Sequence, residues 1–170
     1  MAGATSDDAG DRLAILELLA RYTRGVDRAD LDQLNALWAD GAIVDYGDGP
    51  NDARTWAAGL VAALRRHFLR TQHMLGQSII DLHGDTAEAE TWCQAYHEME
   101  TPDGRIEIIV GGRYLDRLVR TADGWRIAHR RYVLDWNQNG PSTANWTDGL
   151  YAALKRHGAR VPDDPLYTGA

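Results

Sequence analysis

The N-terminal third of the chain carries apolar residues at the three- and four-residue spacing of amphipathic helices. Within residues 11–27, polar residues separate the apolar positions Leu13, Ile15, Leu16, Leu18, Leu19, Tyr22 and Val26. This spacing gathers the apolar side chains on one side of a helix, which we predict over this range. A second helix is predicted over residues 31–38, with Asp30 as its N-cap.

A short strand and a third helix follow. Residues 42–46 are predicted to form a short strand, since most of them are apolar or β-branched. The sequence Gly-Asp-Gly-Pro after them is a turn signal. Asn51 or Asp52 is then the predicted N-cap of a helix that reaches about Phe68.

The second half of the chain changes to long runs with the character of strands. Three short turn signals, His-Gly-Asp, Pro-Asp-Gly and Ala-Asp-Gly, separate residues 71–82, 86–101, 105–120 and 125–137. Connections this short force neighbouring strands to run antiparallel. Strands this long must twist and coil, and Gly76, Gly111 and Gly112 are the expected places for bends or bulges.

Helices followed by a meander of strands predict an α+β fold, with the helices packed on one face of a strongly curved, mainly antiparallel sheet. We expect a single cone-shaped domain over residues 11–140 that encloses an apolar pocket. Residues 1–10 are interpreted as a disordered lead-in. Residues 141–170 are expected to form a short helix, over 145–157, and a Pro-containing tail that packs on the domain or on a neighbouring subunit.

Composition narrows the class of protein. A chain of 170 residues with 44% apolar residues is long enough for one domain with its own core. The formal net charge of −7 argues against nucleic acid and anionic membranes as partners. No apolar run approaches the roughly 20 residues of a membrane span, and the first ten residues do not have the pattern of a signal peptide. With the single cysteine, Cys93, read as a buried small apolar residue, these features predict a cytoplasmic protein.

The candidate chemistry centres on one histidine and one aspartate. Asp27 stands near the C-terminal end of the first predicted helix, five residues after Tyr22, where the helix dipole disfavours a carboxylate. His73 stands early in a strand, and alternation places it on the same face as Leu75 and Ile79. A solvated aspartate and a core histidine are the ordinary interpretations of these residues. If the two meet, the pair can remove and return a proton near neutral pH.

The remaining residues add a pocket and exclude some sites. Six tryptophans either line an aromatic ligand pocket or fill the core, and we expect Trp38, Leu75 and Trp136 to contact a substrate. The other histidines are His67, His83, His97, His129 and His157, and their spacing does not indicate a zinc site. No phosphate-binding or dinucleotide-binding motif appears, so no metal and no cofactor is expected.

The stretches RYTRGVD, RTQHMLG, GGRYLDRLVR and DGWRIAHRRYVLDW resemble the SnoaL-like branch of the nuclear-transport-factor-2-like superfamily over about residues 11–136. Its members include scytalone dehydratase, bile acid 7-alpha-dehydratase and hexachlorocyclohexane dehydrochlorinase. The resemblance implies a catalytic pair of His73 and Asp27, assisted by Tyr22 and Tyr46. It also implies that an anion-recognising arginine in the last strand would be Arg131 or Arg130; Arg131 is taken as the substrate-binding residue.

The resemblance further implies a cofactor-independent lyase. Such an enzyme would eliminate water, or another small leaving group such as formaldehyde or halide, from a hydroxylated aromatic or polycyclic molecule. An isomerase of the ketosteroid type, a non-catalytic small subunit and a ligand-binding module remain alternatives with the same fold. A homo-oligomer is expected, with a trimer favoured over a dimer.

Overall fold

Six strands form one curved sheet in the computed structural model, which describes residues 6–169. Their order across the sheet is β2-β1-β6-β5-β4-β3. The strands and helices follow along the chain as α1 (Ser6–Arg28), α2 (Leu31–Asn35), β1 (Trp38–Asp45), β2 (Pro50–Asp52), α3 (Ala53–His67), β3 (Arg70–His83), β4 (Thr86–Thr101), β5 (Gly104–Thr121), β6 (Gly124–Pro141), the 3-10 helix η1 (Gly149–Tyr151) and α4 (Pro165–Thr168).

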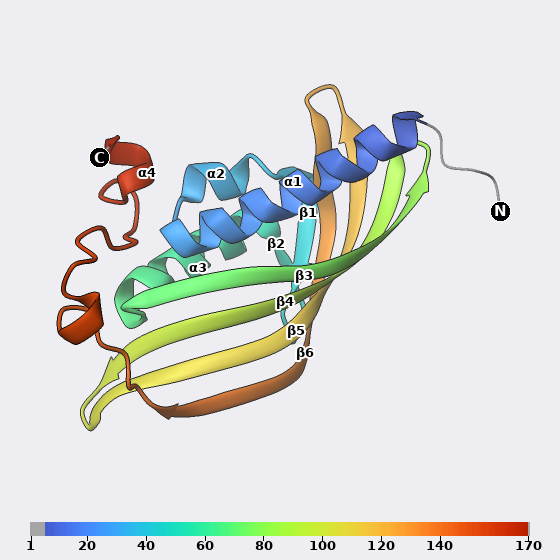
Figure 1. Cartoon of the computed structure of the whole chain (residues 1–170). Helices are drawn as coiled ribbons and strands as arrows, with labels where there is room; N and C mark the ends of the chain where they lie inside the picture. The colour runs from blue at the N-terminus through green and yellow to red at the C-terminus, as the bar shows by residue number, and fades with distance from the viewer. Residues whose placement is uncertain (1–5, 170) are drawn as a thin grey trace.

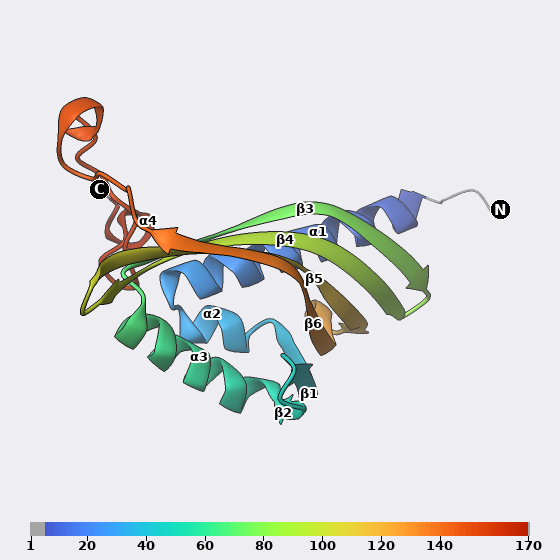
Figure 2. The same ribbon diagram turned by 90° about the horizontal axis from the view of Figure 1, so that it is seen from below.

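α1, α2 and α3 lie inside the curve of the sheet. β3 to β6 form the predicted antiparallel meander, and β1 joins it by running parallel to β6. In Figure 1, α1 lies alongside β3, and Figure 2 shows the sheet arching over α1, α2 and α3. The predicted α+β cone is therefore confirmed, with a mixed sheet that does not close on itself.

Side-chain caps fix where α2 and α3 begin, and a backbone turn fixes where α1 ends. Asp30 is the N-cap of α2, as predicted, since its carboxylate accepts a hydrogen bond from the Gln33 backbone N–H at 3.0 Å. Asp52 caps α3 in the same way, through the N–H of Thr55 at 2.8 Å. α1 ends when Ala29 adopts a left-handed conformation with φ of 49°. This turn places Asp27 in the last turn of the helix, beside the start of β3.

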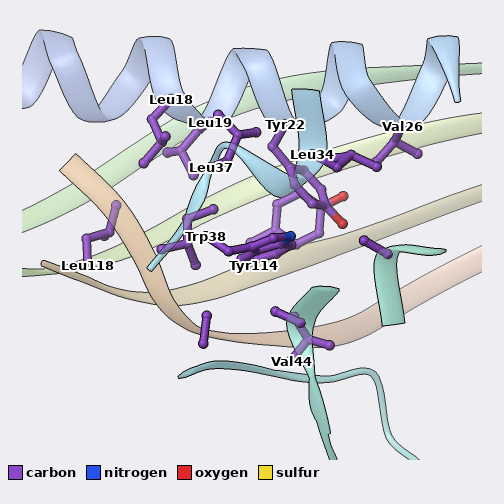
Figure 3. Packing of buried hydrophobic residues seen from close by; sticks show 14 of the residues in the cluster. Leu18, Leu19, Tyr22, Val26, Leu34, Leu37, Trp38, Val44, Tyr114 and Leu118 are labelled. Atoms are coloured by element: carbon purple, nitrogen blue, oxygen red, sulfur yellow. The ribbon is translucent and has the colours of Figure 1, made fainter. Parts of the chain in front are cut away.

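The core lies between α1 and the sheet. Leu18, Leu19 and Tyr22 of α1 are buried in one cluster with residues such as Leu118 of the sheet and Leu34 of α2 (Figure 3). Each such side chain that leaves water contributes about 1.5–3 kcal/mol to folding. No helix within residues 6–169 has the length and apolar content that a bilayer crossing requires.

Bulges bend the long strands at the predicted glycines. The register of β3 against β4 shifts between Leu75 and Ser78, around Gly76, and that of β5 against β6 shifts between Gly111 and Gly112. An extra residue turns every later side chain of the strand to the other face. The prediction that Ile79 shares the face of His73 is therefore wrong: Ile79 is exposed, and Ile80 is buried instead.

Several predicted boundaries are wrong. The interpretation of residues 1–10 as a disordered lead-in fails for residues 6–10, which are the first turns of α1, and residues 1–5 lie outside the described part of the chain. α2 ends at Asn35, so that Trp38 starts β1 rather than closing a helix. The short strand β2 was not predicted; it pairs antiparallel with β1.

The predicted helix over residues 145–157 is reduced to the single turn of η1. Leu150 and Leu154 of this range are 91% and 60% exposed, so none of the described residues covers the apolar side that a helix would present. A short helix without such packing is unstable in water. The following segment instead packs on the end of α1, where the Val161 N–H donates to the Arg28 carbonyl at 2.8 Å.

Candidate functional site

A cavity of about 370 Å³ lies between the helices and the concave face of the sheet. Its lining comes from α1, α3, the segment after β1, and strands β3 to β6, and most of it is aliphatic or aromatic. Cys93 belongs to this lining and is buried, as predicted; burial raises the pKa of its thiol. A cavity of this size and character fits a small apolar molecule.

His73 and Asp27 meet at the wall of this cavity. Nδ1 of His73 lies 2.7 Å from Oδ1 of Asp27, and the backbone N–H of His73 donates to Oδ2 of the same carboxylate at 2.8 Å. Both side chains are 10% exposed. Because both carboxylate oxygens are bound to one residue, the imidazole is held in a fixed orientation, and Nε2 is the ring nitrogen left for a bound molecule.

The charge state of Asp27 follows from two opposing effects. Burial raises the pKa of this carboxyl, but the two hydrogen bonds and the electrostatic interaction with His73, together with the nearby charge of Arg28, outweigh burial, and the net pKa lies below the ordinary value of 3.8. Asp27 is therefore ionised at neutral pH, and it accepts the Nδ1–H proton of His73 in a charge-assisted hydrogen bond.

Two tyrosines form a second polar feature of the cavity. The hydroxyls of Tyr22 and Tyr46 are 2.7 Å apart, so one donates to the other. The Tyr46 ring is stacked between Trp56 and Tyr132, with ring centroids 4.4 and 5.3 Å away. Burial raises the pKa of Tyr22, and it raises the pKa of Tyr46 well above 10. Both hydroxyls therefore keep their protons at neutral pH, and the pair has one O–H left to donate to a ligand.

A buried arginine lies beneath the tyrosines. The guanidinium of Arg130 donates two hydrogen bonds to Asp116, each 2.7 Å long, and neither side chain is exposed. The same guanidinium lies 3.9 Å from the Tyr22 ring centroid and 4.1 Å from that of Tyr114. Its positive charge lowers the pKa of Tyr22, against the larger effect of burial. The cation thus makes the hydroxyl pair a better hydrogen-bond donor.

Arg131, the predicted substrate-binding arginine, faces away from the cavity. It is 57% exposed and forms a loose ion pair with Asp45 at 3.6 Å. Alternation from the buried Trp125 and Ile127 would turn Arg131 inward. A bulge in β6 between those residues and Arg130 reverses the alternation, so Arg130 faces the core instead.

The other predicted substrate contacts also lie outside the cavity lining. Trp38 is 2% exposed and packs edge-to-face on Tyr22 at 5.8 Å, as a core residue behind the site. Leu75 packs partly buried against the core. Trp136 covers Gly111 on the convex face of the sheet, because the second bulge of β6 leaves Leu134 facing the cavity and turns Trp136 outward.

His97 is a cavity residue that we did not predict. Its ring centroid lies 5.5 Å from that of His73 and 5.1 Å from that of Phe68, and its buried Nδ1 has no hydrogen-bond partner among the described residues. Alternation along β4 could have identified it, since Cys93 and Ala95 share its inward face. Burial and the nearby His73 lower the pKa of His97 to about 4.

This low pKa predicts a pH dependence of folding. His97 is neutral in the folded protein down to about pH 4, whereas in the unfolded chain it takes up a proton near pH 6.5. The unfolded state therefore binds more protons between these values, and the free energy of unfolding falls by up to about 3 kcal/mol as the pH drops through this window. Urea unfolding of the protein and of His97→Gln at several pH values measures the difference in slope. If the free energy of unfolding changed equally with pH in both proteins, His97 would not be the group responsible. His83→Gln, at an exposed position beside a turn, is the control.

Within residues 6–169 no group of three or more His, Cys, Asp or Glu side chains is arranged to hold a metal ion. Besides His97 and the Cys93 thiol, the cavity presents an imidazole–carboxylate pair and a donor pair of tyrosines. This arrangement can move a proton and can stabilise negative charge on an oxygen.

Solved structures share the fold. A candidate scytalone dehydratase from Novosphingobium aromaticivorans matches 83% of this chain and 95% of its own, with 20% identity and a TM-score of 0.72. A hexachlorocyclohexane dehydrochlorinase from Novosphingobium barchaimii matches 84% of this chain and 98% of its own, with 16% identity and a TM-score of 0.72. At these identities the likeness concerns the fold alone.

Sequence comparison shows the family as well as the fold. An uncharacterised protein of Mycobacterium tuberculosis is 32% identical over 127 residues, which make up 71% of this chain and 82% of that protein. The family model of the SnoaL-like domain matches residues 7–131, a stretch that includes Asp27, His73 and the two tyrosines. The chain therefore belongs to the SnoaL-like domain family, within the nuclear-transport-factor-2-like superfamily.

Proposed function

We propose that this protein is a cofactor-independent lyase that eliminates water or another small leaving group from a hydroxylated aromatic or polycyclic molecule. The observation that carries the proposal is the 2.7 Å contact between Nδ1 of His73 and Oδ1 of Asp27 at the wall of an apolar cavity. The resemblance to a dehydratase and a dehydrochlorinase, both of which carry out eliminations by name, supports this class of reaction.

His73 acts as the general base. Its Nε2 takes a proton from a carbon next to an activating group, and Asp27 stabilises the imidazolium that forms. Because both groups are mostly shielded from water, their interaction is stronger than it would be in solution. The C–H electron pair forms the new double bond, and the leaving group departs from the neighbouring carbon with its own bonding pair. A positioned base of this kind contributes about 10²–10⁴-fold to the rate.

The Tyr22–Tyr46 pair stabilises the leaving group, and a departing hydroxide takes up the proton that His73 removed from carbon, so that water is released and His73 returns to its neutral form. The free O–H of the pair donates a hydrogen bond to the oxygen or halogen on which negative charge develops, and Arg130 lies under one ring to support it. Stacking on Trp56 and Tyr132 holds the Tyr46 ring in place before the reaction. Edge-to-face contacts with Trp38 and Tyr114 hold the Tyr22 ring, so that the active site reorganises little during the step.

The tyrosine pair yields a test of how the two hydroxyls share their role. We expect Tyr22→Phe and Tyr46→Phe each to lower kcat by about 10–100-fold, since each removes one of two linked donors. The double variant should be only slightly slower than either single variant, because the two act as one unit. Tyr151→Phe, in the exposed η1, is the control. Losses that multiply in the double variant would contradict a joint role.

An isomerase is the second candidate. The same base would then return its proton to another carbon of the same molecule, and the Tyr22–Tyr46 pair would stabilise an enolate in between. A turnover assay in D₂O with hydroxylated aromatic and steroidal compounds separates the two reactions: elimination releases a smaller product, whereas isomerisation keeps the mass apart from incorporated deuterium. A non-catalytic module of the same fold would bind such compounds without converting any of them.

A further inference from the structure

A second pocket of about 490 Å³ lies on the other side of the Asp27–His73 pair. Its walls are the last turns of α1, the first residues of β3 and the C-terminal segment around Trp146 and residues 158–160. Figure 1 shows this C-terminal segment beside the end of α1 and the start of β3. His73 lines this pocket as well as the apolar cavity, whereas the rest of the two linings differs.

Four arginines line this pocket: Arg24, Arg28, Arg70 and Arg160. The one carboxylate in its lining, Asp27, is already engaged by His73. Such a concentration of positive charge contrasts with the formal net charge of −7 of the whole chain. This positive charge lies in the pocket and in the C-terminal segment that lines it.

Carboxylates outside the pocket compensate only part of this charge. Arg28 pairs with Asp164 at 3.1 Å, and Arg70 lies 4.0 Å from Glu98, which is also bound by Arg105 at 3.1 Å. The guanidinium of Arg24 donates instead to the neutral amide oxygen of Gln33, at 2.9 and 2.6 Å.

Arg160 likewise bonds only neutral oxygens. Its Nη1 donates to the carbonyl of Asp27 at 2.9 Å and to the Thr71 hydroxyl at 3.0 Å. These bonds hold the guanidinium against the two segments that carry the Asp27–His73 pair. They leave its positive charge without an opposite charge in direct contact among the contacts described for it.

Besides Nε of Arg28, which faces Asp164 in an ion pair at 3.1 Å, two buried donors of this pocket have no hydrogen-bond partner in the described part of the chain. They are Nη2 of Arg160 and the indole Nε1 of Trp146, whose ring is stacked under the Arg70 guanidinium at 4.0 Å. A buried donor without an acceptor destabilises the folded state by about 1–3 kcal/mol. Both groups can only donate hydrogen bonds. An acceptor bound in the pocket would therefore supply the partner that each of them lacks.

We infer that this pocket binds the anionic group of a small organic acid, a carboxylate or a phosphate, through Arg24, Arg70, Arg160 and Trp146. Planar guanidinium groups are suited to hold either anion with paired hydrogen bonds. The site is distinct from the apolar cavity, and its occupancy does not depend on any elimination. Since the Asp27–His73 pair separates the two pockets, an anion bound here lies next to the proposed base.

Binding is measured on the full chain with benzoate and, separately, inorganic phosphate, at constant ionic strength maintained with sodium chloride. Protein labelled with ¹⁵N-tryptophan reports on the site directly, because the Nε1–H resonance of Trp146 should shift on titration. Trp146→Phe assigns that resonance. A shift with benzoate alone assigns the pocket to carboxylates, and a shift with phosphate alone assigns it to phosphates.

The decisive comparison is between two double variants of equal charge change. Arg24→Gln/Arg70→Gln should weaken binding at least about tenfold, since two charge-assisted contacts are lost. Arg66→Gln/Arg117→Gln removes two exposed arginines outside the pocket and should leave the affinity within about twofold. The inference is overturned if neither anion shifts the Trp146 resonance, or if both double variants weaken binding equally. No turnover is involved, so the proposed lyase activity stands or fails separately.

Discussion

Replacing His73 with alanine is expected to lower turnover of a converted substrate by about 10²–10⁴-fold, because the general base is removed. Asp27→Asn should cause a loss of similar size, since an amide cannot stabilise the imidazolium ion. His73→Ala keeps the backbone N–H that Asp27 also binds, so the fold should be retained. Rates of purified variants under saturating substrate measure the effect, and thermal unfolding of the same samples checks the fold.

His83→Ala is the matched control for this experiment. His83 ends β3 on the exposed side of a turn, so its removal should leave both turnover and stability unchanged. Full turnover in either His73→Ala or Asp27→Asn would end the proposed mechanism, even if the substrate were correctly identified. The fold and the family membership would be unaffected by that outcome.

Breaking the buried Arg130–Asp116 pair should produce the largest loss of stability. Asp116→Asn leaves the guanidinium without its counter-charge at a fully buried position. The removal of one partner of such a pair typically lowers the free energy of unfolding by about 3–5 kcal/mol. Urea unfolding at neutral pH measures the change. The tyrosine pair above Arg130 should be disturbed as well, so turnover of the folded fraction should also fall.

The neighbouring pair Arg131–Asp45 supplies the control. It is exposed and 3.6 Å apart, so Arg131→Gln should change stability by less than about 1 kcal/mol. The double variant Arg130→Met/Asp116→Leu should be less destabilised than Asp116→Asn, because it buries no unpaired charge. A loss below about 1 kcal/mol in Asp116→Asn would contradict the role assigned to this pair.

The periodicity of the chain was sufficient to predict much of the architecture. The apolar spacing of α1 and α3, the caps Asp30 and Asp52, and the short turns between the long strands all act locally, over a few residues. They therefore appear in the sequence itself, and they led to the correct fold class. The parallel pairing of β1 with β6 was not predictable in this way, because it joins strands separated by most of the chain.

The candidate site, like the fold, was predictable from the sequence only in part. Asp27, His73, Tyr22 and Tyr46 were candidates before the fold was known, because a family resemblance connected them. The face of the sheet on which each neighbouring residue lies follows from the pairing of the strands instead. Two bulges in β6 place Arg130 and Leu134 inward and turn Arg131 and Trp136 out, and one in β3 exchanges Ile79 for Ile80. A bulge depends on how two strands pair, so a single strand's pattern does not reveal it, although one extra residue reverses every side chain that follows.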